Sequence, residues 1–173
     1  MKRKIFLILL ILVIIYVCKT NEQNFFIPDT AIRLRVIPNS NSPEDINIKE
    51  KVKKYLETDI YTLTKDTEDI EEARTIISDS IPSIEKNISD IFNENKYNLP
   101  YKVNYGLNYF PEKRYKGLTY VDGYYESLVI SIGEANGDNW WCVLFPNFCL
   151  IDTKEQHEYK SYIKELFDKY SKK

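Results

Sequence analysis

Side chains that commonly carry out chemistry are scarce in this chain of 173 residues. Its one histidine, His157, stands among charged residues at the start of an amphipathic segment, which favours a surface position. Nucleophilic catalysis needs a nucleophile with a base in hydrogen-bond reach, and no G-x-S-x-G motif supplies one. The loop at 133–139 lacks the Lys-Ser/Thr of a phosphate loop and the spaced acids of a calcium loop. We therefore expect no catalytic residue, no cofactor, no metal and no enzymatic activity.

A pair of carboxylates offers the one catalytic alternative. Glu126 and Glu134 could flank a cleft together with Trp140 and Trp141, and paired carboxylates hydrolyse glycosidic bonds when their separation is right. The alternative function is therefore a cell-wall-associated glycan hydrolase or glycan-binding module. A simpler interpretation leaves Glu126 as an ordinary strand residue that faces solvent.

Two other features suit binding better than catalysis. Arg33 and Arg35 alternate with apolar residues, so both guanidinium groups belong to one face of a strand, where they lie in solvent or pair with acids of a partner. Trp140 and Trp141 are adjacent, and adjacent strand residues point to opposite faces. One Trp should enter the core and the other should emerge as an interface anchor, and the sequence does not say which.

Cys142 and Cys149 flank a turn at 145–148. If Phe145 pairs with Phe148 in a hairpin, the two cysteines lie diagonally on one face, near the upper separation for a disulfide. Both a bridge and two free thiols stay open. Two thiols with a single histidine make a poor zinc site.

The first residues have the pattern of an export signal. Lys2, Arg3 and Lys4 precede an apolar run at 5–17 and Cys18, which fits a basic start held in the cytoplasm. About 21 Å of helix is shorter than a ~30 Å bilayer core, which favours a signal peptide. Because no small-x-small cleavage site follows, an uncleaved anchor over residues 5–18 is an equal alternative.

The rest of the chain is acidic and has no basic run. The whole chain carries a net charge of −2, and four of its bases stand in the first twenty residues. A nucleic-acid partner is therefore not expected, nor is a polybasic lipid-binding patch.

The chain divides into three parts by pattern. We expect a signal peptide or anchor at 1–20, a tether at 21–30, and a single extracytoplasmic domain at 31–173. Period-two alternation predicts strands over 31–37, 102–109 and 125–132, and the apolar run 140–145 predicts a central strand. Helical spacing predicts a helix opened by Ser42-Pro43, a second from about 66 to 92 with a kink or fresh start near Pro82, and a last helix from Asp152. The expected fold class is α+β: an N-terminal strand, two to three amphipathic helices, a mainly antiparallel sheet of about four strands and a C-terminal helix.

Two segments of the sequence resemble a known family. Residues 31–45 read AIRLRVIPNSNSPED, and residues 123–128, 132–134 and 139–146 read GYYESL, IGE and NWWCVLFP, with Cys149 following. In order and spacing they resemble the stage II sporulation protein R family over roughly residues 28–152. The chain departs from the family pattern at Pro38, Asn41 and Asn147, and its C-terminal region is short.

The resemblance implies a secreted signal of sporulation. Members of this family are exported from the forespore into the space between the forespore and mother-cell membranes. There they trigger a membrane-embedded protease, stage II sporulation protein GA, which then processes pro-sigma-E in the mother cell. The implied partners are that receptor-protease and, if the first segment stays uncleaved, the membrane; no small-molecule substrate is implied. A purely structural envelope protein is a third interpretation.

We expect the receptor to contact three regions of the chain. These are the Arg33/Arg35 strand, the loop with Asn39 and Ser40, and the hairpin that carries Trp140, Trp141 and Pro146.

Overall fold

The computed structural model describes residues 31–115 and 118–146, together with the isolated positions 3, 8–11, 13, 24 and 25. Most of the expected export segment, most of the tether, Cys149 and the expected last helix lie outside the described residues. Within the described part, no helix combines the length and the hydropathy needed to cross a bilayer. The boundaries at 20 and 30 and the export of the domain stay predictions.

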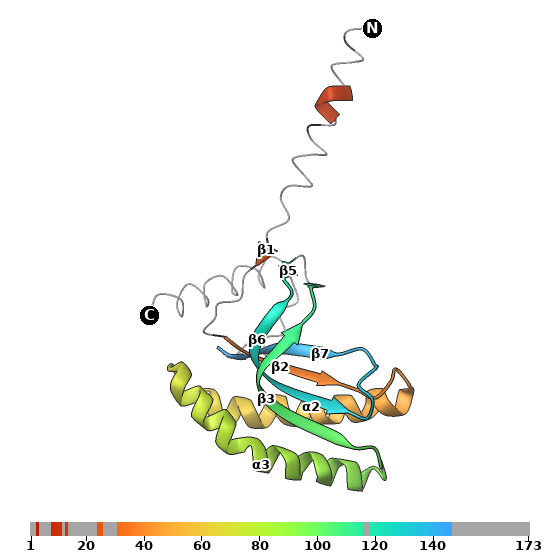
Figure 1. Ribbon diagram of the computed structural model, residues 1–173, viewed down its shortest axis with the longest axis vertical. Coiled ribbons are helices and arrows are strands. Elements are labelled where there is room, and N and C mark those ends of the chain that lie inside the picture. The colour runs from red at the N-terminus through yellow and green to blue at the C-terminus, as the bar shows by residue number, and fades with distance from the viewer. Residues whose placement is uncertain are drawn as a thin grey trace.

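A four-stranded mixed sheet forms the centre of the domain, in the order β3-β6-β2-β7. β2 pairs in parallel with β6 and antiparallel with β7, and β3 pairs antiparallel with β6. The strands are β2 (Ile32–Ile37), β3 (Tyr101–Phe110), β6 (Gly123–Ile132) and β7 (Trp140–Phe145). β2 therefore lies inside the sheet, between two segments that are nearly one hundred residues away in the sequence (Figure 1).

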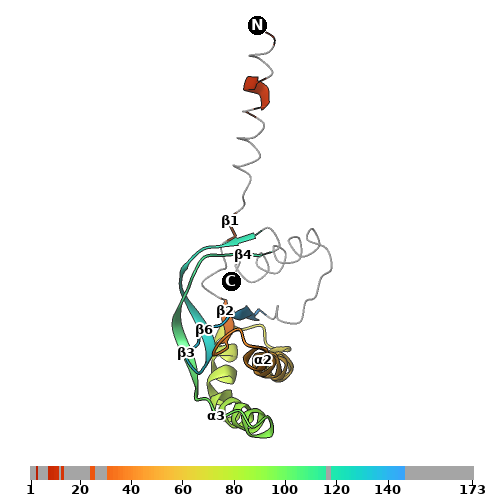
Figure 2. The ribbon, with the colours of Figure 1, turned by 90° about the vertical axis from the view of Figure 1, so that its right-hand side faces the viewer.

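Two long helices cover one face of this sheet, as Figure 2 shows. Helix α2 (Pro43–Thr64) begins after Ser42, whose hydroxyl accepts a hydrogen bond from the Asp45 amide at 3.2 Å. Helix α3 (Ile70–Glu94) begins after Asp69, whose carboxylate accepts from the amides of Glu71 and Glu72. Both starts follow the rule that short polar side chains satisfy the free amides of a first turn.

The hydrophobic core lies between the helices and the sheet. It is formed by the residues of the helical and strand faces that turn toward each other. Its largest buried members are Ile32, Leu34, Ile48, Leu56, Ile60, Ile77, Ile84, Ile88, Leu128, Ile130 and Ile132. The spacing of these residues is three or four in the helices and two in the strands, which is the pattern that the sequence shows.

One of two alternatives and one strand assignment were wrong. Of the kink or fresh helix start expected near Pro82, the fresh start does not occur, because α3 is one helix with Pro82 inside it, at an exposed position. The run 140–145 is not a central strand: β7 pairs only with β2 among the described strands and lies at the edge of its sheet. Its last residues are apolar because both of its faces are covered, with Val143, Leu144 and Phe145 all buried.

A smaller sheet was not anticipated. It contains β1 (Asn24–Phe25), β5 (Leu118–Tyr120) and β4 (Lys113–Tyr115), in the order β1-β5-β4. Because β4 follows β3 and β5 precedes β6, this sheet stands at the far end of one long hairpin, away from the helices (Figures 1 and 2). The fold class is α+β, with helices on a mainly antiparallel four-stranded sheet, as the sequence predicts.

Candidate functional site

The loop between β2 and α2 is held inside the protein by one buried carboxylate. Asp45 is 5% exposed and accepts hydrogen bonds from the side chains of Asn39, Ser40 and Tyr97. Burial by itself would raise the pKa of this carboxyl, but these hydrogen bonds outweigh it and bring the pKa down to about 2. Asp45 is therefore ionised at neutral pH, and it fixes Asn39 and Ser40 toward the interior.

The same loop is joined to the loop that precedes β7. The amides of Asn136 and Gly137 donate to the carbonyls of Asn39 and Pro38, each at 3.0 Å. The side chain of Asn39 also accepts from the Glu134 amide at 3.0 Å. We call these two segments, 38–42 and 133–139, the loop junction.

Two glycines allow the loops of the junction to approach this closely. A Cβ atom on Gly133 would overlap the side chain of Asn39, and one on Gly137 would overlap the Ser40 backbone. Gly133 also has a φ of +56°, a left-handed conformation that favours glycine. The Gly-bearing loop is thus explained by contact within the chain.

Arg33 lies on the sheet face opposite the helices but is only 2% exposed. Its guanidinium carbon is 3.2 Å from the centroid of the Tyr125 ring and 5.1 Å from that of Phe110. Its Nε atom has no hydrogen-bond partner among the described residues. Burial lowers the pKa of Arg33 to about 10, so the group still carries its charge at neutral pH.

Arg35 is half-buried on the same face and joins three segments. Its Nη1 donates to the Tyr109 carbonyl at 3.3 Å. With the Asn139 amide oriented so that its oxygen faces Arg35, that oxygen accepts from Nη2 at 2.8 Å and from Nε at 2.9 Å. Burial lowers the pKa of Arg35, and burial followed by the nearby Arg35 charge lowers that of Lys113. Within the described part of the chain, no acid forms an ion pair with Arg33, Arg35 or Lys113.

The two tryptophans lie on opposite faces of β7, as adjacent strand residues should. Trp140 packs against the hydrophobic core on the helix side, and the Lys53 amine lies 5.2 Å from its ring centroid. Trp141 is opposite Arg35 in the ladder and meets the ring of Tyr120 edge-to-face, with centroids 4.6 Å apart. Both are half-buried. Because Trp140 is the one that packs against the core, it is the Trp on the core side.

Cys142 lies within β7, and Pro146 directly follows that strand. Pro146 is buried. Cys142 is half-buried on the core side and is disulfide-bonded to a partner outside the described residues. The pairing of Cys142 with Cys149 stays a prediction.

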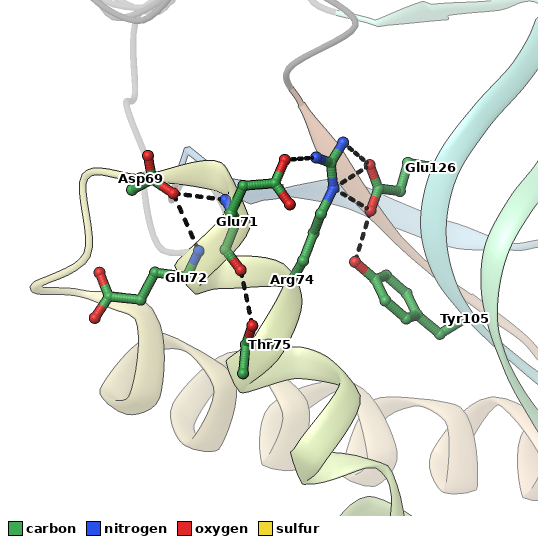
Figure 3. Close-up of polar contacts among 7 residues, drawn as sticks. All are labelled: Asp69, Glu71, Glu72, Arg74, Thr75, Tyr105 and Glu126. Atoms are coloured by element: carbon green, nitrogen blue, oxygen red, sulfur yellow. Dashed lines mark hydrogen bonds and ion pairs between the residues drawn. The ribbon is translucent and has the colours of Figure 1, made fainter.

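A charged network that the sequence did not reveal connects α3 to the sheet (Figure 3). Arg74 donates through Nε and Nη2 to the carboxylate of Glu126, at 2.7–3.1 Å, and also binds Glu71. The hydroxyl of Tyr105 donates to the same Glu126 carboxylate at 2.7 Å. The Arg74 hydrogen bonds lower the pKa of Glu126, so this carboxylate is ionised and fully engaged. It braces the helix against the sheet and has no free oxygen for general acid catalysis.

The glycan-hydrolase alternative requires Glu126 and Glu134 to lie close together, and this fold separates them. Glu126 lies within β6 on the helix side, whereas Glu134 follows the end of that strand. The six residue steps from Glu126 to Ile132 extend over ~20 Å at ~3.3 Å per residue. Catalytic carboxylate pairs stand roughly 5–9.5 Å apart. The two carboxylates therefore do not form one site.

A metal site or a groove that could take a ligand, elsewhere in the described part of the chain, would be a further candidate. No group of three or more metal-ligating side chains gathers there. A groove of about 630 Å³ between α2 and α3 is lined by residues of both charge signs. Several of them bind each other: Tyr55 donates to Asp59 and accepts from Asn87. This groove offers no consistent chemistry to a ligand.

Comparison with known proteins identifies the family. The model of the family described as stage II sporulation protein R (spore_II_R) matches residues 28–155. The chain belongs to the stage II sporulation protein R family. A curated relative, stage II sporulation protein R of Bacillus subtilis (strain 168), is 37% identical over 134 residues. This match covers 78% of the chain and 60% of the relative, so the chain spans about three fifths of the relative's length. No solved structure matches.

The fold explains why the two family segments occur together. Residues 31–45 supply β2 and one half of the loop junction, whereas residues 123–146 supply β6, β7 and the other half. β2 pairs with both of those strands, so the segments form one continuous unit. In the sequence Asp45 stands out only as the last residue of the first family segment, and its role was missed because Tyr97, one of its partners, comes from a distant segment.

Proposed function

We propose that the chain is an exported signalling protein of sporulation that binds and activates a membrane-embedded protease. In this proposal the protease is stage II sporulation protein GA, it stands in the mother-cell membrane, and its activation leads to processing of pro-sigma-E. The domain acts in the space between the forespore and mother-cell membranes and is not itself an enzyme. The family match over residues 28–155 supports the sporulation role, and the resemblance of the two sequence segments implies a signal rather than a protease.

The chemistry of the described residues supports a binding role. Two carboxylates of the domain are engaged within the fold: Asp45 by three side chains and Glu126 by Arg74 and Tyr105. A ligand activates a receptor only if it binds the active state more tightly than the inactive one. A domain whose polar side chains are already hydrogen-bonded within the fold suits that task, because little further ordering accompanies its binding.

The proposed contact surface is the region around Arg35 and Trp141. Both are half-buried and lie beside Lys113, whose amine is 5.6 Å from the Trp141 ring centroid. Two cations without an acidic partner in the described part of the chain, next to an indole, fit an acidic side chain of the receptor. In this arrangement Asn39, Ser40 and Arg33 act by holding the surface in place.

The proposal is tested by co-expressing the full chain with the protease and its pro-sigma-E substrate, and by measuring the fraction of substrate cleaved. Wild-type chain should raise cleavage far above the level of the protease alone. Trp141→Ala should reduce this gain about tenfold, as loss of an interface anchor does.

Lys113→Gln, with Lys86→Gln as its control at an exposed position on α3, tests the charge at this surface. The first should weaken activation and the second should not. If the wild-type chain gives no gain in cleavage, the proposed function is wrong. If cleavage is intact in Trp141→Ala and Lys113→Gln proteins with native circular dichroism, the proposed contact surface is wrong.

A further inference from the structure

Three large side chains stand exposed together on the β3–β6 hairpin. Leu107 is 73%, Tyr109 50% and Tyr124 73% exposed. Tyr109 is opposite Tyr124 in the ladder, their ring centroids are 5.7 Å apart, and Leu107 lies two residues before Tyr109 on the same face. A contiguous apolar surface of this kind on a soluble domain commonly marks an interaction site.

The end of helix α3 leaves this surface uncovered. At the start of β3, the Tyr101 hydroxyl donates to the Glu85 carbonyl of α3. Further along, Tyr105 and the first turns of α3 meet through Glu126 and Arg74. Beyond these contacts the β3–β6 hairpin bends away from the helices toward the smaller sheet, as Figures 1 and 2 show.

β3 is also an open edge. It is the outer strand of its sheet, and among the described strands it pairs only with β6. Its ten residues keep an unbroken register and carry a single charge, on Lys102. Natural edges are usually shortened, bulged or charged to prevent pairing with another chain, and β3 has little of this protection. Such an edge accepts an added strand, whose backbone gives affinity and whose alternate side chains give specificity.

Acidic side chains stand beside this surface on the side of the helices and at the Asp122 turn. Glu71 and Glu72 project from the first turn of α3, and Asp122 accepts from the Tyr109 hydroxyl at 3.2 Å (Figure 3 shows the glutamates). On the side of the helices the base Arg74 is already shared between Glu71 and Glu126, and Arg35 binds the Tyr109 carbonyl from the opposite face of the sheet. The complementary partner is therefore basic as well as apolar, and an anionic lipid surface is disfavoured.

We infer that the arm face, which consists of Leu107, Tyr109, Tyr124 and the free edge of β3, docks an extended segment of a partner protein that carries apolar and basic side chains. This deepens the proposed function and rests on it in one respect, that the partner is the receptor-protease. The segment adds to β3 as a strand, its apolar residues contact Leu107 and the two tyrosines, and its Lys or Arg residues face Glu71 and Asp122.

Matched variants test the inference in the cleavage assay with full chain, protease and substrate. The double variant Leu107→Ser/Tyr124→Ser should reduce activation about tenfold, with an unfolding midpoint close to that of wild type. The control is Leu63→Ser/Tyr61→Ser, the same chemical change at exposed positions on the last turn of α2. Glu71→Gln should reduce activation about threefold, against no change in Glu85→Gln at an exposed position further along α3.

Photo-crosslinking supplies a readout that a structural role would not move. A benzoyl-phenylalanine in place of Tyr124 should crosslink to the receptor, and one in place of Tyr61 should not. The inference is overturned, and the proposed function stands, if the wild-type chain activates the protease and two further results hold. The Leu107→Ser/Tyr124→Ser variant must activate as well as its Leu63→Ser/Tyr61→Ser control, and the probe at position 124 must crosslink no more than the probe at position 61. A crosslink from position 124 to a second copy of the chain, or Tyr124-dependent sedimentation with anionic vesicles, would also overturn it. Failure of the wild-type chain to activate overturns the proposed function instead.

Discussion

Beneath the loop junction, Asp45 and Tyr97 turn their polar groups into the protein and hold Asn39 and Ser40, whereas at the arm face Tyr109 and Tyr124 present their rings to solvent. Both regions contain tyrosine and acid in contact. At the junction the hydroxyl of Tyr97 binds a buried carboxylate, but the Tyr109–Asp122 bond lies on the surface. The family segment that ends at Asp45 therefore contributes to the buried framework, by which we mean the contacts that hold the fold together. Most of the accessible surface comes from β3, which carries no family motif.

The largest effect is expected from removing the carboxylate at the junction. Asp45→Ala should lower the free energy of unfolding by about 3 kcal/mol, because Asn39, Ser40 and Tyr97 lose a charged acceptor in a buried place. Urea denaturation measures this change. The neighbouring exposed Glu44→Ala should cost below about 1 kcal/mol, since it removes only an acid from a first turn. Equal losses in the two variants would contradict a framework role for the junction.

The pH dependence of stability sharpens the same point. The pKa of Asp45 falls from 3.8 to about 2 on folding, which corresponds to about 2 kcal/mol. Because the folded pKa is depressed, this stability is present above pH ~4 and is lost as the pH falls toward 2. The difference in unfolding free energy between wild type and Asp45→Asn should therefore shrink by about 2 kcal/mol from pH 6 to pH 2. A constant difference would show that Asp45 has an ordinary pKa.

Arg33 tests whether the far face of the sheet belongs to the framework as well. Arg33→Ala should cost about 2 kcal/mol, because it removes packing against Tyr125 and Phe110 and leaves a cavity. Arg33→Met fills most of that space without a buried charge, so its stability should stay within about 1 kcal/mol of wild type. Thermal or urea unfolding decides between them. If Met costs as much as Ala, the charge itself stabilises the fold.

The smallest effect is expected where helix α3 is braced near the arm face. A double-mutant cycle of Arg74→Ala and Glu126→Ala should give a coupling energy of about 1 kcal/mol, because the pair is bidentate but about a third of the Arg74 side chain is exposed. The surface pair Lys53–Glu50 is the control and should couple by at most about 0.5 kcal/mol. Similar couplings in both cycles would mean that the network of Figure 3 adds no more than a surface ion pair.

Local patterns in the sequence were enough for most of the elements. Ser42 and Pro43 marked the start of α2, alternation placed Arg33 and Arg35 on one face, and adjacency placed the two tryptophans on opposite faces. These features depend on residues within a few positions of each other. Pro82 misled the same reasoning, because a long helix packed against the core tolerates one missing hydrogen bond at an exposed position.

Contacts between distant segments could not be predicted from these local patterns. Nothing local in β7 shows that it is an edge strand, since its apolar run reflects cover on both faces and not its place in the sheet. The burial of Arg33 depends on Tyr125 and Phe110, and the exposure of Leu107 and Tyr124 depends on where α3 begins relative to β3. The alternation of β3 alone would have placed Leu107 in the core.

The sequence by itself determined the two long helices, the four strands of the main sheet, the faces of these elements and the family, because periodicity, capping and short motifs act over neighbouring residues. Only the tertiary structure decided which polar residues are framework and which apolar residues remain exposed. The physical reason is that burial is a property of the assembled layers: a carboxylate such as Asp45 becomes internal, and a tyrosine such as Tyr124 stays external, according to what other segments bring beside it.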